Sequence, residues 1–226
     1  ILLLSIKDLS YITKLFNFIF ESLINPNTSR LIQTVAENRQ PYFGEWSGNF
    51  GPSIKSFPLF FWLFFIGSTY LVFNISKVFN KKERIVISCS YVVFLLGIIF
   101  SRYSENHLLN GANFISVFFY FSGALLFLIV LGFYYYKYYK VGKEKEFESI
   151  DFGLIMLLSF FVLTIVTVRG AVRLIMVLVP PASIIVSYFV VNLIYKFKER
   201  NEVGNFKFLS LIFAGLVLIA VVYSGY

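Results

Sequence analysis

The sequence predicts an all-α polytopic membrane protein, and its composition, apolar runs and loop charges all point to this class. Of 226 residues, 58% are hydrophobic and 14% are charged, whereas a soluble domain carries about 25% charged residues. Six apolar runs approach the roughly 20 residues that a helix needs to cross about 30 Å of hydrocarbon. Because backbone groups in lipid must be hydrogen-bonded locally, we expect a bundle of about six transmembrane helices, at about 57–76, 85–101, 112–136, 151–168, 172–195 and 206–226.

The first 56 residues have a different character. The chain opens within an apolar run at Ile1, which indicates a fragment that starts at the end of an upstream transmembrane helix. Tyr11–Leu23 then carries apolar side chains at helical spacing, and this predicts an amphipathic helix in the membrane interface. The stretch from Glu45 to Ser56 is rich in Gly, Ser and Pro and is predicted to be loop. Residues 1–56 are therefore expected to form a helix end and an external loop ahead of the helices in 57–226.

The basic residues predict the orientation in the membrane. Twelve of the 20 lie in three short connections, and the positive-inside rule makes this side cytoplasmic: Lys77, Lys81, Lys82, Arg84, Lys137, Lys140, Lys143, Lys145, Lys196, Lys198, Arg200 and Lys207. The segment Thr34–Pro41 and the C-terminus after Tyr226 should then be extracellular, in a multi-pass protein of the cell membrane. Since the charges are spread between apolar runs, we expect the lipid bilayer as a partner and no nucleic acid. A single cysteine, Cys89, excludes an internal disulfide.

A few polar residues are candidates for chemistry. Arg169 and Arg173 are four residues apart, which predicts a shared helix face. Their guanidinium groups suit carboxylate or phosphate, although snorkelling to the interface is an equally good explanation. Glu37 lies in the polar segment before the apolar runs, where an ordinary solvated carboxylate would also be found. His107 and Glu105 could form a metal pair but have no third ligand at a suitable spacing.

Two motifs resemble the catalytic subunit of oligosaccharyltransferase. Thr34-Val35-Ala36-Glu37 matches the T-x-x-E of that family's external loop, and Gln40-Pro41 follows, with Arg39 as an inserted residue. Val172-Arg173-Leu174-Ile175-Met176-Val177-Leu178-Val179-Pro180 resembles the family's V-R-L-M-L-V-L-A-P segment. The resemblance covers about residues 15–75 and 150–195. The family typically has four spans after the loop, so the hairpin at about 85–136 looks like an insertion.

The resemblance implies an archaeal-style glycosyltransferase of protein N-glycosylation. The full-length enzyme would transfer a glycan from a dolichyl-linked mono- or diphosphate carrier to Asn of an N-x-S/T sequon in an acceptor polypeptide. It implies catalytic roles for Glu37 and Arg173, with Glu37 also a ligand of a divalent metal, Mn or Mg. Substrate binding falls on Arg173 and Thr34. Arg169 has no counterpart in the family's motif, and we expect it only to support substrate binding from its place beside Arg173.

The resemblance also implies parts that this sequence does not contain. The family's D-x-D motifs belong to N-terminal helices and its W-W-D-Y-G motif to a C-terminal globular domain. The fragment alone is therefore expected to be inactive. The alternative is a non-enzymatic transporter or flippase for lipid-linked sugars, although such proteins often contain repeated halves and no repeat is visible here.

Overall fold

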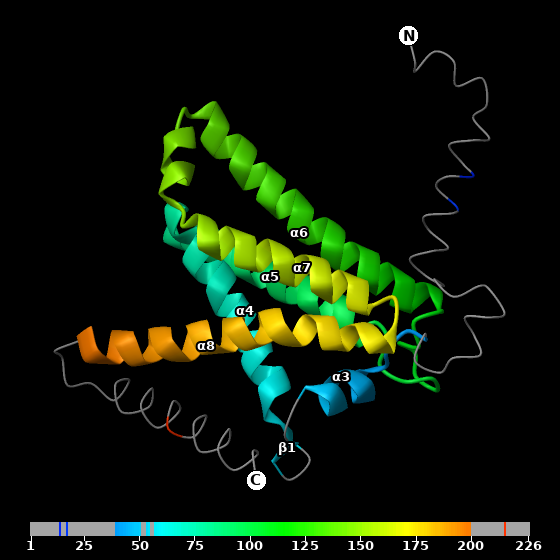
Figure 1. Cartoon of the computed structure of the whole chain (residues 1–226). Coiled ribbons are helices and arrows are strands. Elements are labelled where there is room, and N and C mark those ends of the chain that lie inside the picture. Colours follow the sequence, from blue (N-terminus) through cyan, green and yellow to red (C-terminus); the bar gives the residue numbers. More distant parts are fainter. Residues whose placement is uncertain are drawn as a thin grey trace.

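The computed structural model describes residues 39–50, 53–54 and 57–199, together with Lys14, Asn17 and Gly215. These residues form a bundle of helices with one very short strand hairpin (Figure 1). In chain order the elements are α3 (Phe43–Asn49), β1 (Ser53–Ile54), β2 (Phe57–Pro58), α4 (Leu59–Ile75), η3 (Ser76–Val78), α5 (Lys81–Phe100), α6 (Phe114–Lys140), η4 (Glu144–Ser149), α7 (Phe152–Val168), η5 (Val172–Leu174) and α8 (Ile175–Glu199).

The described helices confirm the prediction of a helical membrane protein. Four stretches are long and apolar enough to cross a bilayer: Leu59–Val78, Lys81–Phe100, Phe114–Lys140 and Val172–Tyr195. Helix α7 is also apolar but has 17 residues, which at 1.5 Å per residue is about 26 Å. The span predicted at 206–226 and the amphipathic stretch Tyr11–Leu23 fall outside the described residues, apart from Gly215, Lys14 and Asn17, which are helical.

Helix α4 lies at the centre of the bundle and contacts α5, α7 and α8. Aromatic side chains fill this centre: Phe64 of α4 lies 6.0 Å from Phe161 of α7 between ring centroids, and both rings are fully buried. Helix α6 packs mainly on α5, so much of its surface is not covered by other helices. Only 17% of its most apolar stretch is buried within the protein. In a bilayer that open surface of α6 would contact lipid tails.

The α5–α6 hairpin is held by a close approach of the two backbones at glycines. A Cβ added at Gly97 would lie 3.0 Å from the carbonyl oxygen of Phe119, and one added at Gly123 would lie 3.0 Å from that of Val93. Small residues of this kind let membrane helices approach closely, since helix association in lipid depends on packing rather than on the hydrophobic effect.

Gly123→Leu should therefore separate α5 from α6 and lower the free energy of unfolding by about 1–3 kcal/mol, as overpacking typically does. Equilibrium unfolding in mixed detergent micelles would measure this. Gly132→Leu is the matched control, because a Cβ at Gly132 meets nothing within 4 Å. Equal stability of the two variants would show that the close approach does not hold the hairpin.

One end of the bundle gathers lysines and tyrosines. Here the turn between α4 and α5 meets the end of α6: Glu83 accepts hydrogen bonds from Lys137 Nζ at 2.5 Å and from the Tyr138 hydroxyl at 2.9 Å. Phe79 packs edge-on against Tyr138 and Phe147, with ring centroids 5.0 and 5.7 Å apart. We call this the lysine end. It contains two of the connections that the charge pattern predicts to be cytoplasmic.

The prediction that Glu45–Ser56 is loop is wrong for its first part, where α3 runs from Phe43 to Asn49. The carboxylate of Glu45 accepts the backbone N–H of Tyr42 at 2.8 Å, which caps the first turn of the helix. Trp46 and Phe50 are almost completely buried and tie α3 to the bundle. This Gly- and Ser-rich segment is therefore helical because the side chains of Trp46 and Phe50 are buried against the bundle. Beyond it, β1 and β2 pair antiparallel, with Ser53 opposite Pro58.

Candidate functional site

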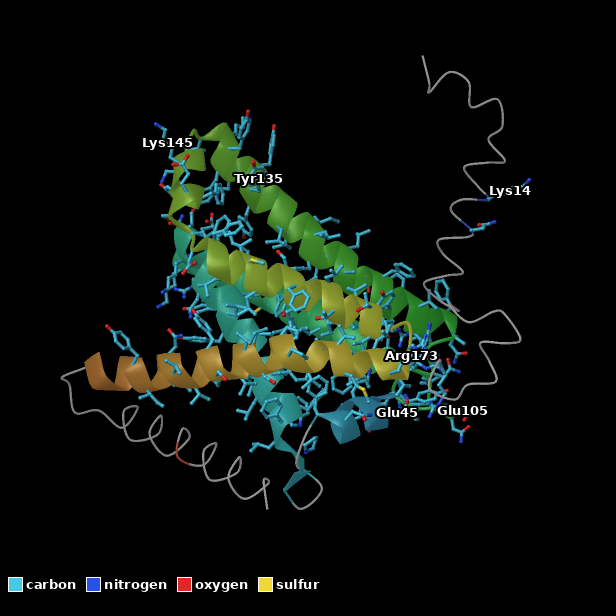
Figure 2. All side chains as sticks on the ribbon, in the orientation of Figure 1. Lys14, Glu45, Glu105, Tyr135, Lys145 and Arg173 are labelled. Atoms are coloured by element: carbon cyan, nitrogen blue, oxygen red, sulfur yellow. The ribbon has the colours of Figure 1, made fainter. Side chains whose placement is uncertain are left out.

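Three segments that are distant in the sequence meet at the other end of the bundle. They are the stretch Arg39–Phe43, the α5–α6 loop between Ser101 and Asn113, and the connection from α7 to α8. The backbone N–H of Phe43 donates to the carbonyl oxygen of Arg102 at 3.1 Å, and that of Val172 donates to the carbonyl oxygen of Arg39 at 2.9 Å. Figure 2 shows the labelled Arg173, Glu45 and Glu105 at this end, far from Lys145. We call it the arginine end.

The bond between Val172 and Arg39 connects the two motifs that resemble the oligosaccharyltransferase subunit. Arg39 follows Glu37 by two residues, and Val172 directly precedes Arg173. The last part of the Thr34–Pro41 segment therefore lies against the first part of the Val172–Pro180 segment. Thr34 and Glu37 themselves lie outside the described residues.

Arg169 and Arg173 do not share a helix face, so that prediction is wrong. Arg169 caps the C-terminus of α7, Ala171 is extended, and Arg173 lies in the short 3-10 helix η5. The i,i+4 rule applies to an unbroken helix, and the backbone leaves the helix at Gly170 and Ala171. The two side chains also differ in environment: Arg169 is 5% exposed, whereas Arg173 is exposed to solvent.

The guanidinium of Arg169 is buried without a carboxylate partner among the described residues. Its Cζ lies 5.4 Å from the centroid of the Tyr120 ring on α6. Its Nε and Nη1 donate to no acceptor in that part of the chain. Burial, and secondarily the positive charge of Arg102, lower the pKa of Arg169 to about 10. The group is therefore still a cation at neutral pH.

Arg102 is a residue of this site that the sequence reasoning did not select. Its Nη1 donates to Oε1 of Gln40 at 2.8 Å, and its Cζ lies 4.4 Å from the centroid of the Tyr42 ring. Its Nε is buried and finds no acceptor among the described residues. Burial lowers the pKa of Arg102; Tyr42 opposes this effect, and the smaller effects of the Arg39 and Glu45 charges have opposite signs. The available signal was a lone arginine in a connection that the charge pattern places on the side away from the lysines.

The α5–α6 loop is folded around Arg102. Arg102 forms an antiparallel bridge with Asn110, and Tyr103 N–H donates to the carbonyl oxygen of Leu109 at 2.7 Å. Gly111 has φ +89°, and a Cβ there would lie 2.9 Å from Cγ of Arg102. Only glycine adopts this backbone conformation readily while leaving room for the arginine stem. The loop thus fixes Arg102 in place.

Arg39, the inserted residue, forms an ion pair with Glu45. Its Nη2 lies 2.5 Å from Oε1 and its Nη1 lies 3.2 Å from Oε2. The Arg39 side chain is about half exposed, so the pair adds little stability, on the order of 0–1 kcal/mol. Its effect is geometric, since Glu45 also caps α3 through Tyr42. Arg39 thus links the end of the Thr34–Pro41 segment to α3.

The described residues do not supply a metal site by themselves. No group of three or more His, Cys, Asp or Glu side chains occurs among them. The carboxylate of Glu45 forms an ion pair with Arg39, and Nδ1 of His107 accepts a hydrogen bond from the backbone N–H of Leu109 at 3.2 Å. His107 therefore stabilises a turn of the α5–α6 loop rather than forming a metal pair with Glu105. The metal ligand predicted from the resemblance, Glu37, falls outside the described residues.

Comparison with protein-family models, with curated protein sequences and with solved structures finds no match to this chain.

Proposed function

We propose that this chain is part of the membrane domain of an archaeal-style oligosaccharyltransferase. In the full-length enzyme it would help to transfer a glycan from a dolichyl-linked mono- or diphosphate carrier to Asn of an N-x-S/T sequon. The observation that carries the proposal is the hydrogen bond from Val172 to Arg39, at 2.9 Å. It brings the ends of the two family-like motifs side by side although Arg39 and Val172 are 133 positions apart in the sequence.

In this proposal the arginine end is the extracellular end, and each motif has a separate task. Arg173 is exposed next to the meeting point of the motifs, where its planar fork can reach a phosphate of the carrier or an acidic group of the acceptor. Glu37 would contact the acceptor amide, with Thr34 beside it. Arg169 and Arg102 supply further positive charge at the same end.

The proposal includes a divalent cation, Mn or Mg, with Glu37 as one ligand. Carboxylate oxygens suit these hard cations, which take about six ligands. When bound, the cation would polarise the groups that contact it. The described residues do not contain the rest of such a ligand set.

A transfer assay tests the proposal. Full-length protein in nanodiscs would be incubated with lipid-linked oligosaccharide and two labelled peptides that differ in one residue, Asn-x-Thr and Gln-x-Thr. We expect a mobility shift for the Asn peptide, loss of the shift with EDTA, and no shift for the Gln peptide.

The alternative, a transporter or flippase for lipid-linked sugars, is supported by the apolar helices and the buried Arg169. It predicts movement of the carrier across vesicles without modification of either peptide. That result would contradict the transferase proposal.

A further inference from the structure

We propose that Arg102 and Arg169 together hold a phosphate-type anion at the arginine end. The two side chains come from different helical hairpins: Arg102 from the α5–α6 loop and Arg169 from the end of α7. Neither arginine has an ion pair among the described residues, since the neighbouring Glu45 is bound by Arg39. Both lie at the arginine end: Arg102 Nη1 donates to Gln40 at 2.8 Å, and the neighbouring Arg39 accepts through its carbonyl oxygen from the backbone N–H of Val172, three residues after Arg169.

The burial of Arg169 is the reason that a counterion is required. A charge removed from water costs several kcal/mol unless it is paired, and a second cation nearby adds repulsion. Arg169 is 5% exposed, and two of its three guanidinium nitrogens have no acceptor in the described part of the chain. A shift of the pKa to about 10 leaves the side chain protonated at neutral pH. Deprotonation therefore does not remove the cost, whereas a bound anion does.

The arrangement favours phosphate over a smaller or less charged anion. Nε of Arg102 and Nε and Nη1 of Arg169 are three buried donors without an acceptor among the described residues, and a phosphate group has several oxygens that can accept from more than one donor. Each guanidinium lies near an aromatic ring, Tyr42 for Arg102 and Tyr120 for Arg169. These ring contacts favour the charged form of both side chains.

This site is distinct from the one that the resemblance assigns to Arg173. Arg102 belongs to the hairpin that the resemblance does not cover, so the anion site would be a feature of this chain. Binding of an anion does not depend on the proposed function. Identification of that anion as the phosphate of a lipid-linked sugar does rest on it.

Thermal unfolding of the full-length protein tests the site without any transfer reaction. At matched ionic strength, inorganic pyrophosphate should raise Tm relative to chloride, because ligands that bind the native state stabilise it. Arg102→Gln should weaken pyrophosphate binding by at least about tenfold, through loss of a charge-assisted contact. Lys140→Gln, an exposed change at the lysine end, is the control and should leave binding unchanged.

Arg169→Met should have different effects in chloride and in pyrophosphate. It removes a buried unpaired cation, so Tm in chloride should rise above that of the wild type, and the response to pyrophosphate should disappear. A Tm in chloride well below that of the wild type, together with no response of the wild type to pyrophosphate, would mean that a carboxylate of the protein already neutralises Arg169, and the proposal would be overturned. Arg169→Lys, which keeps the charge, should bind pyrophosphate more weakly than the wild type but better than Arg169→Met.

Two further arms distinguish the source of the phosphate. Nanodiscs that contain dolichyl phosphate should raise Tm and compete with pyrophosphate if the anion is a lipid headgroup, while nanodiscs with neutral lipid should not. A response to inorganic pyrophosphate alone would identify a soluble anion at the same residues. A response to neither source, or equal responses of the wild type, Arg102→Gln and Arg169→Met, would overturn the proposal.

Discussion

Replacement of Glu37 by Gln is expected to lower glycan transfer by the full-length enzyme by about 100-fold. Gln keeps the shape of Glu but removes the negative charge that a divalent cation and an acceptor amide would require. A charge-assisted contact is worth about 1.5–3 kcal/mol, and about 2.7 kcal/mol corresponds to that factor of 100. Initial rates with the labelled Asn-x-Thr peptide, measured across a series of Mn and Mg concentrations, would detect the loss.

Glu37→Asp tests the effect of side-chain length separately from the effect of the negative charge. It keeps the carboxylate but shortens the side chain by about 1.5 Å, and a misplacement of about 1 Å in a reacting group can cost about 100-fold. Glu148→Gln is the matched control, because Glu148 is an exposed carboxylate at the lysine end. If Glu37→Gln transfers glycan at the wild-type rate with unchanged metal dependence, the Thr34–Pro41 segment is a connector and the resemblance has been misread.

The helices could be predicted from the sequence because the bilayer imposes one simple requirement. A run of about 20 apolar residues must satisfy its backbone in lipid as a helix, and Leu59–Ile75 and Phe114–Lys140 follow this rule. The observed helix boundaries differ from the predicted ones where charged residues belong to the first turn of a helix. Helix α5 begins at Lys81, ahead of the predicted residue 85, since Glu83 accepts the backbone N–H of Asn80 at the start of the first turn.

Helix α3 and the role of Arg102 could not be predicted, since both depend on contacts between distant segments. Phe43 stacks on Phe100 and Tyr103, with ring centroids 4.8 and 5.5 Å apart, and this fixes the start of α3 on the end of α5. Arg102 contacts Gln40, which is 62 residues away in the sequence, through the fold alone. Periodicity within a short window contains no information about such pairs.

The candidate site was therefore predictable in its residue types but not in its arrangement. The spacing of Arg169 and Arg173 predicts two arginines on one helix face. The structure makes them different, because the chain leaves the helix at Gly170 and turns into η5. As a result Arg169 is buried within the protein and Arg173 is exposed to solvent. Substitutions of the two should affect stability and activity in different proportions.

Arg173→Ala is expected to lower kcat/KM for glycan transfer by about 10- to 100-fold while leaving the fold unchanged. The side chain is exposed, and surface substitutions usually change the free energy of unfolding by no more than about 0.5 kcal/mol. Loss of charge-assisted hydrogen bonds to a phosphate or carboxylate of the substrate would account for the decrease in kcat/KM, since such bonds contribute about 1.5–3 kcal/mol. Transfer kinetics with the carrier and the peptide varied in turn, alongside Tm, would separate the two effects.

Arg173→Lys tests whether the guanidinium group must form two parallel hydrogen bonds or whether its positive charge is enough. Lys restores the positive charge but not two parallel hydrogen bonds, so it should recover activity only in part. Lys140→Ala, at an exposed position of the lysine end, controls for the loss of one positive charge from the surface. Recovery should appear in the KM of the substrate that Arg173 contacts, because a ground-state contact is reported there. Wild-type kinetics of Arg173→Ala with both substrates would exclude Arg173 from the site and leave Arg102 and Arg169 as the cations that act at this end of the bundle.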